Sequence, residues 1–255
     1  MQVRLNAPMR WPGVNFVKSS LGEINLAINP VRPFRIFQLI ESLPAERIAK
    51  VPIPSHRGAG GLTLLETFLT IAAARIVAAR RIFEFGTYLG ATTLNLALNT
   101  PEDAEIFTLD LDERHAEELI QDAADATLTK SHISAARSLD YMDIPAGRKV
   151  KALMGDSTKF DFSDWKGSMD LIFVDGGHDL ATVTSDTTNA LNLADPGKLS
   201  CIIWHDYGNP QYVPLTSYLD ELSERLQIFH IEDTMLCVWF NDPLKSIGPR
   251  LLNLQ

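Results

Sequence analysis

The sequence predicts a single α/β domain on a doubly wound, mostly parallel seven-stranded sheet that ends in an antiparallel hairpin. From residue 61 onward, short apolar runs rich in β-branched residues alternate with helical stretches, which is typical of parallel strands joined by crossover helices. The last two runs are separated only by residues 232–234, a hairpin distance. A chain of 255 residues with 45% apolar residues is long enough for one such core.

Each expected element follows from its apolar spacing. The expected strands are residues 81–85, 105–109, 150–154, 170–174, 199–204, 226–231 and 235–240. The expected helices are residues 62–79, 92–98, 113–126, 133–141, 180–193 and 213–224. In an open sheet of this kind the ligand is expected beyond the carboxyl ends of the strands.

Three segments are expected along the chain. Residues 1–60 are rich in proline and predict an N-terminal arm or lid over a larger body. Residues 61–242 form the predicted main domain, and residues 243–255 a C-terminal tail. Residues 111–149 form a long link between the second and third strands, and we expect this link to shape substrate specificity.

Charge and composition exclude several classes of protein. The net charge is −9 and the basic residues are scattered, so a nucleic-acid partner is not expected. No apolar stretch is long enough to span a membrane, and no secretory signal is visible. Cys201 and Cys237 lie in apolar runs and predict buried thiols rather than a disulfide, which favours a cytoplasmic protein.

A glycine-rich turn follows the first strand. The chain reads Glu84-Phe85-Gly86-Thr87-Tyr88-Leu89-Gly90, and Ala91-Thr92-Thr93 opens the next helix. Glycines let a ligand approach the backbone, and the helix amino terminus offers unpaired N–H donors. A tight turn with no ligand is the alternative. The spacing differs from the G-x-G-x-x-G pattern of dinucleotide-binding dehydrogenases.

This turn resembles the first motif, E/D-x-G-x-x-x-G, of the class I S-adenosylmethionine-dependent methyltransferases, and the resemblance extends over about residues 60–240. It implies a Rossmann-like sheet and S-adenosylmethionine as the methyl donor. The turn residues implied to bind this donor are Glu84, Gly86, Thr87, Tyr88, Gly90 and Thr92.

Acidic residues at the next two strand ends extend this site. Asp110 follows the glycine turn by about twenty residues, where an acid reaches ribose hydroxyls, although helix capping is the alternative. Asp112 fits the capping role better. Asp156 and Ser157 match the position where this class binds the adenine, with a local cap as the rival interpretation.

Two His-Asp clusters follow the fourth and fifth strands. They are Asp175-Gly176-Gly177-His178 and His205-Asp206-Tyr207, and both are expected at one edge of the sheet. Together they resemble the subgroup of macrocin-type sugar O-methyltransferases. This resemblance implies Asp175 and Asp206 as metal ligands and His178 as the catalytic base. His205 departs from the acid of some relatives, so the site holds Mg²⁺, a softer metal, or none with His205 contacting the substrate.

The predicted function is O-methylation of a small-molecule hydroxyl on a sugar, phenol or natural-product intermediate, with or without a divalent metal. The alternatives are a metal-independent N- or C-methyltransferase, or a non-catalytic protein that binds an adenosyl ligand. The expected partner is a small-molecule acceptor, and a homodimer is left open. Arg57, in a basic loop, is a candidate contact of the donor carboxylate or of the substrate. The Asn209-Pro210-Gln211-Tyr212 string is interpreted as a loop before the next helix.

Overall fold

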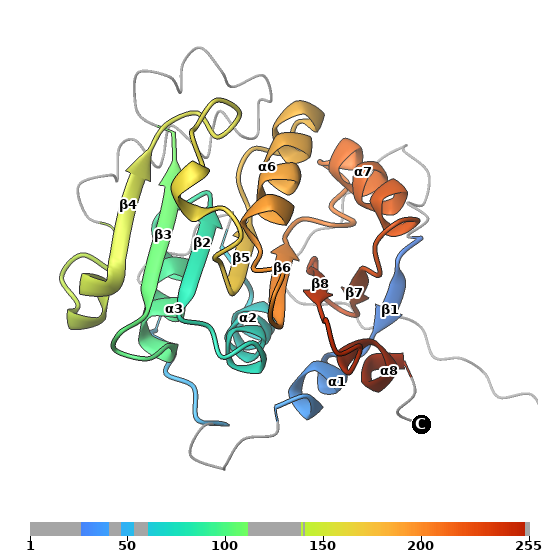
Figure 1. Ribbon diagram of the computed structural model, residues 1–255, viewed down its shortest axis with the longest axis horizontal. Helices are drawn as coiled ribbons and strands as arrows, with labels where there is room; N and C mark the ends of the chain where they lie inside the picture. The colour runs from blue at the N-terminus through green and yellow to red at the C-terminus, as the bar shows by residue number, and fades with distance from the viewer. Residues whose placement is uncertain (1–26, 41–46, 54–60, 112–138, 140, 253–255) are drawn as a thin grey trace, which may run out of the picture.

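The computed structural model describes residues 27–40, 47–53, 61–111, 139 and 141–252. Its centre is one sheet of eight strands in the order β1-β7-β8-β6-β5-β2-β3-β4, with helices on both sides (Figure 1). The pairs β5–β6, β2–β5, β2–β3 and β3–β4 are parallel, and β8 runs antiparallel to both β6 and β7. The predicted doubly wound, mostly parallel class is confirmed.

The strands lie where the apolar runs predict them, with ends that differ by up to three residues. Their bounds are β2 Arg81–Phe85, β3 Glu105–Asp110, β4 Val150–Met154, β5 Leu171–Val174, β6 Ser200–Trp204, β7 Phe229–Ile231 and β8 Cys237–Asn241. An eighth strand, β1 Asn29–Val31, pairs in parallel with β7 beyond the hairpin. The sheet therefore has eight strands rather than the seven predicted, because Asn29–Val31, with Pro30 at its centre, adds an edge strand.

The main helices also follow the predicted pattern. They are α2 Leu64–Ile76, α3 Ala91–Asn99, α6 Leu180–Leu193 and α7 Val213–Ser223. Two six-residue helices, α1 Pro33–Gln38 and α8 Ile247–Leu252, contact each other, and two 3-10 turns cover Pro145–Lys149 and Ser163–Trp165. The helix predicted at 113–126, and all of the one at 133–141 except residues 139 and 141, lie outside the described residues.

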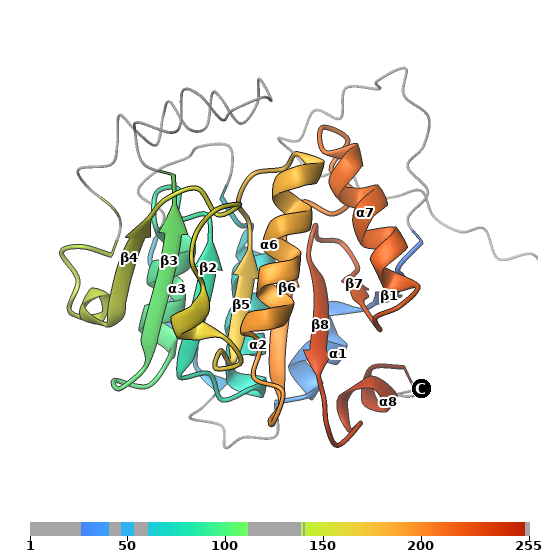
Figure 2. The same cartoon turned by 45° about the horizontal axis from the view of Figure 1, so that its top comes forward.

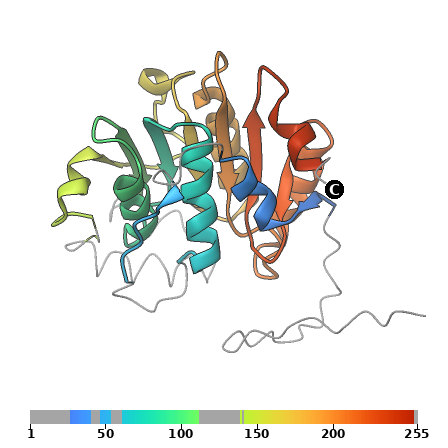
Figure 3. The ribbon, with the colours of Figure 1, turned by 90° about the horizontal axis from the view of Figure 1, so that it is seen from below.

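Alternate residues of each strand point to opposite faces of the sheet and pack into two separate hydrophobic cores. On one face, Ile82, Phe173 and Ile203 pack with α1, α2, α3 and α8, as seen from below in Figure 3. On the other face, Phe83, Ile172 and Trp204 pack with α6 and α7, which lie over the sheet in Figure 2. The sheet is thus buried on both sides, as expected of a parallel sheet. Among the described helices, none has the length and apolar character needed to cross a membrane.

The chain order reverses at the centre of the sheet. From β2 the chain crosses through α3 to β3 on one side, whereas from β5 it crosses through α6 to β6 on the other. Such a switch point opens a crevice between the carboxyl ends of the two central strands. The predicted glycine turn follows β2, and the Asp175–His178 string follows β5, so both flank this crevice.

Candidate active site

The glycine turn after β2 is shaped by its contact with the end of the neighbouring strand β5. Gly86 has a φ of +87°, and a Cβ atom there would lie 2.1 Å from the carbonyl oxygen of Asp175. Gly90 has a φ of +82° and caps α3 in the left-handed conformation. Tyr88 also has positive φ, at 47°. Glycine at position 86 is therefore required both by its backbone angles and by the close approach of β5.

Asp110 organises this turn in the structure. Its Oδ2 accepts hydrogen bonds from the backbone N–H groups of Thr87, at 3.0 Å, and Tyr88, at 2.9 Å. Its Oδ1 accepts a bond from Leu111 N at 2.8 Å. The residue predicted to bind ribose thus already orders the backbone of the predicted donor loop, a contact that the sequence analysis did not anticipate.

Glu84 is buried beneath the turn. Its Oε2 accepts hydrogen bonds from the hydroxyls of Thr108, at 2.6 Å, and Thr93. Burial raises the pKa of Glu84 to about 8, and the two hydroxyls offset only part of this effect. Thr93 reaches Glu84 because it faces the core, whereas Thr92, a predicted donor contact, is half-buried at the start of α3.

A cavity of about 340 Å³ lies after β4, lined by Gly155, Asp156, Lys159, Phe160 and Asp161. Asp156 accepts bonds from the N–H and hydroxyl of Thr158 and pairs with Lys159 Nζ at 2.8 Å. Burial raises the pKa of Asp156, but the bonds from Lys159 and Thr158 outweigh burial and hold it below the usual value. Asp156 is thus ionised, and its carboxylate already accepts bonds from the residues of the turn that follows it.

Ser157, the neighbour of Asp156, is tied to α6. Its side chain faces the buried Asp186, whose carboxyl also lies against Gly176. Burial raises the pKa of Asp186 to about 7, although the Ser157 contact lowers it. The predicted adenine loop and the turn after β5 therefore share one buried carboxyl.

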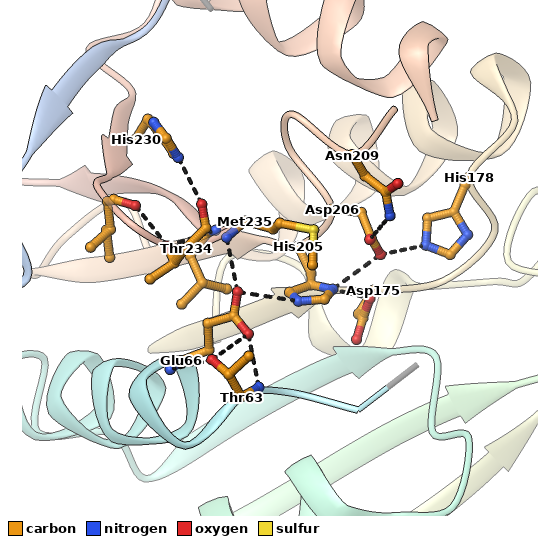
Figure 4. A network of polar contacts seen from close by, with 12 residues as sticks. Thr63, Glu66, Asp175, His178, His205, Asp206, Asn209, His230, Thr234 and Met235 are labelled. Carbon is orange, nitrogen blue, oxygen red and sulfur yellow. Dashed lines mark hydrogen bonds and ion pairs between the residues drawn. The ribbon is translucent and has the colours of Figure 1, made fainter. Parts of the chain in front are cut away.

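The ends of β5 and β6 bring the two His-Asp clusters together. His178 Nε2 lies 2.9 Å from Asp206 Oδ2, and His205 Nδ1 lies 3.0 Å from the same oxygen (Figure 4). His205 Nδ1 also lies 3.2 Å from Asp175 Oδ1. All four side chains predicted for catalysis and metal binding therefore meet at one place.

His205 is the buried centre of this group, with only 5% of its side chain exposed. Burial lowers its pKa, but Asp175, Asp206 and Glu66 outweigh burial and raise the pKa well above 6.5. His205 is therefore an imidazolium among carboxylates. The same contacts from His178 and His205 keep the pKa of Asp206 far below its usual value despite burial.

The loop after β6 supports this group through residues that the sequence analysis set aside. Asn209 Nδ2 donates to Asp206 Oδ1 at 2.6 Å. The buried Tyr212 ring stacks on His178, with centroids 3.8 Å apart and planes 8° apart. The Asn209–Tyr212 string is a loop before α7, as predicted, and in addition it holds both polar members of the His178–Asp206 pair. No sequence signal other than proximity to His205-Asp206 indicated this.

Glu66 on α2 was also missed. It is 1% exposed, and its Oε1 lies 3.7 Å from His205 Nε2. The Thr63-x-x-Glu66 spacing is a capping-box signal, and Thr63 and Glu66 do form such a box at the start of α2. That signal indicates a helix start, and it carries no information about a distant histidine.

Asp175, His205 and Asp206 can hold a metal ion, because one donor atom from each lies within 4.8 Å of the others. Two ligands at right angles on an ion with bonds of about 2.1 Å lie about 3 Å apart, close to the 3.0 and 3.2 Å from His205 Nδ1 to the two oxygens. Two carboxylates and one imidazole suit Mn²⁺, Fe²⁺, Co²⁺ or Zn²⁺ better than Mg²⁺. The donor set therefore fits a divalent ion that would replace the proton on Nδ1. Arg57 and Asp112 lie outside the described residues.

Residues 83–207 match the family described as Methyltransferase domain. None of the curated proteins compared matches the sequence.

Solved structures with similar folds include the O-methyltransferase TomG from Streptomyces achromogenes, with S-adenosylmethionine, at 18% identity and TM-score 0.47, covering 71% of this chain and 81% of TomG. They also include the PaMTH1 methyltransferase from Podospora anserina, with S-adenosylhomocysteine. Its sequence identity is 17% and its TM-score 0.46, and the match covers 81% of this chain and 85% of PaMTH1. At such TM-scores the similarity carries no argument about function.

The family match spans β2 to the end of β6, which includes the glycine turn, Asp110, Asp175 and the His205-Asp206 pair. It confirms the predicted class, and it does not distinguish the macrocin-type subgroup from others. Residues 83–207 of this chain therefore match a methyltransferase domain, as the resemblance to the class I S-adenosylmethionine-dependent methyltransferases predicts.

Proposed function

We propose that the protein transfers a methyl group from S-adenosylmethionine to a hydroxyl of a small molecule, such as a sugar, a phenol or a natural-product intermediate. The observation that carries this proposal is the meeting of His178, Asp206, His205 and Asp175 beside the glycine turn, across the Gly86–Asp175 contact. A base next to the donor crevice is what transfer to oxygen requires.

His178 is the proposed general base. Asp206 is ionised and can only accept a hydrogen bond, so His178 Nε2 donates and Nδ1 is the nitrogen able to take a proton. Stacking on Tyr212 fixes the plane of the ring. In the proposed reaction the acceptor oxygen forms a bond to the methyl carbon as the sulfur–methyl bond breaks, and the acceptor proton goes to His178.

The donor site is proposed to comprise the glycine turn with Gly86, Thr87, Tyr88 and Gly90, the acids Glu84 and Asp110, and the Asp156-Ser157 loop. Bound S-adenosylmethionine would supply a methyl group already activated by its sulfonium, so positioning accounts for much of the rate. Thr92 and Asp175, at the carboxyl end of β5, are the remaining proposed contacts of the donor. The cavity beside Asp156 supports a ligand at this end of the crevice.

A divalent ion at Asp175, His205 and Asp206 is part of the proposal. When bound, such an ion would lower the pKa of an acceptor hydroxyl and orient it. In its absence the buried His205 imidazolium places a positive charge at the same position. Metal analysis of the purified protein, with and without chelator, decides between the two.

The proposal is tested by incubating the protein with S-adenosylmethionine and a panel of sugars, phenols and polyketide hydroxyls, and by measuring S-adenosylhomocysteine and the methylated product by mass spectrometry. His178→Ala should lower kcat by roughly two to four orders of magnitude, while calorimetry shows unchanged binding of S-adenosylhomocysteine. Lack of S-adenosylhomocysteine binding by the wild-type protein overturns the proposed donor. Near-normal turnover by His178→Ala overturns the base.

A further inference from the structure

Glu66 joins three parts of the molecule that are distant in sequence. Its Oε2 accepts bonds from the N–H and hydroxyl of Thr63, both at 2.8 Å, at the start of α2. Its Oε1 accepts a bond from Met235 N at 2.8 Å, in the turn between β7 and β8, and faces His205 (Figure 4). Helix, hairpin and the end of β6 therefore meet at one buried carboxylate.

His205 Nε2 faces Glu66 and makes no hydrogen bond with any described residue. The 3.7 Å separation from Oε1 is longer than a hydrogen bond, so the contact is one of charge. Both Glu66 oxygens accept hydrogen bonds from backbone N–H groups, Oε2 from Thr63 and Oε1 from Met235, as an ionised carboxylate does. A full negative charge therefore lies beside the imidazole edge that points away from Asp175 and Asp206.

This charge distinguishes the two orientations of the His205 ring. In the observed orientation Nε2 faces Glu66, and Nδ1 faces Asp175 and Asp206. Rotating the ring by a half-turn about its bond to Cβ would place carbon atoms at both positions. A carboxylate beside Nε2 favours an N–H over a C–H there, and it leaves the Nδ1 lone pair as the one available to an ion.

We propose that Glu66 is a positioning residue of the Asp175–His205–Asp206 cluster: it holds the His205 ring with Nδ1 towards the two aspartates, and so prepares the donor set for a divalent cation. The inference deepens the proposed function, because it rests on the metal site of that proposal. Carboxylates behind a ligating histidine act in this way in metal sites generally, and losing one typically weakens metal binding 10- to 100-fold.

The capping box is the competing explanation of Glu66, and the chain offers a control for it. Thr63→Ala removes the side chain that caps α2 and leaves the Glu66 Oε1 contacts with His205 and Met235 in place. It should cost about 1 kcal/mol of stability. Glu66→Gln keeps the size and an acceptor oxygen, and removes the charge.

The test measures Co²⁺ affinity of the full-length protein by calorimetry and by the visible absorption of the bound ion. Glu66→Gln should raise the Kd for Co²⁺ about 10- to 100-fold, Thr63→Ala should leave it nearly unchanged, and neither should change binding of S-adenosylhomocysteine. In a His205→Asn background, Glu66→Gln should have no further effect. Unchanged Co²⁺ affinity in Glu66→Gln, equal weakening in Thr63→Ala, or additive weakening in the double variant overturns the proposal.

A second measurement separates this inference from the metal site itself. Nitrogen-15 NMR of the metal-free protein at one pH reports which His205 nitrogens carry protons. We expect a protonated Nε2 in the wild type and a changed His205 signature in Glu66→Gln, with His178 and His230 unchanged. If the wild type binds no Co²⁺, the metal part of the proposed function fails. An identical His205 signature in both proteins then overturns the role of Glu66.

Discussion

Two pairs of buried carboxyls flank the crevice, and their acidities are shifted in opposite directions. On the donor side, Glu84 and Asp186 face threonine and serine hydroxyls, and burial raises their pKa values to about 8 and about 7. On the catalytic side, Glu66 and Asp206 face imidazoles, which outweigh burial and lower both pKa values.

Burial alone therefore does not determine the charge of a carboxyl in this protein, because the partner decides it. A hydroxyl shares a hydrogen bond without compensating the cost of a buried charge. A cationic imidazole compensates this cost for Glu66 and Asp206, whereas burial still raises the pKa of Asp175 despite the contact with His205. The donor side is thus organised by neutral contacts and the catalytic side by charge. Each variant below removes one element of this contrast.

Gly86→Ala should have the largest effect, since Gly86 is where the two sides touch. An alanine Cβ would collide with the Asp175 carbonyl, and its φ of +87° is strained for a side chain. We expect a loss of up to about 6 kcal/mol in the free energy of unfolding, because strain and overpacking add. Urea unfolding measures this. Gly61→Ala is the control, since nothing lies within 4 Å of its added Cβ; equal losses in both variants would contradict the contact.

His205→Ala removes the cation from the catalytic side and leaves three carboxylates without it. Breaking a buried ion pair by removing one partner costs about 3–5 kcal/mol, so the free energy of unfolding in chelator should fall by that amount. His230→Ala is the matched control, because half-buried His230 hydrogen-bonds the neutral Thr234 carbonyl and packs against Tyr207, and no carboxylate among the described residues pairs with it; its loss should cost about 1 kcal/mol. Similar losses in both variants would show that His205 carries no special charge.

Asp186→Asn should reduce the pH dependence of stability, to which Glu84 also contributes. Between the usual pKa of 3.8 and about 7, the folded protein keeps a proton that the unfolded chain has lost, so the free energy of unfolding falls as pH rises. A shift of this size corresponds to a loss of about 2–3 kcal/mol between about pH 5 and pH 8. Urea unfolding across this range measures the slope, and an equally steep slope in the variant would exclude Asp186 as its source.

Most of the sheet was predictable from sequence because most strands are largely apolar runs that end at, or just before, a glycine or an acid. Residues 81–85 and 150–154 are strands with the predicted ends, and 180–193 is the predicted helix. Strand β1 could not be predicted, since its three residues carry little propensity and are ordered by pairing with Phe229–Ile231.

The residues of the candidate site were predictable from the sequence, but the contacts among them were less so. Asp175, His178, His205 and Asp206 follow neighbouring strand ends, and parallel strands bring such ends to one edge. The contact of Glu66 with Met235 spans 169 residues and leaves no local pattern. Asp110 was assigned to a ligand, and its two bonds to the glycine turn depend on the conformation of that turn.

Tyr212 should have the smallest effect, and it tests whether the catalytic side depends on packing as well as charge. Stacked aromatic rings contribute about 0.5–1.5 kcal/mol, so Tyr212→Leu should lower kcat up to about tenfold by releasing the plane of His178. Tyr212→Phe keeps the stacked ring and should retain kcat within about twofold. Binding of S-adenosylhomocysteine should be unchanged in both, since Tyr212 contacts the base and not the donor turn.

The pair also separates the ring from its hydroxyl. If Tyr212→Phe loses as much kcat as Tyr212→Leu, the phenol hydroxyl and not the stacked face supports His178. If neither variant changes kcat, the bond from His178 Nε2 to Asp206 is sufficient to hold the imidazole. Charged contacts alone would then position the catalytic side, whereas neutral hydrogen bonds organise the donor side.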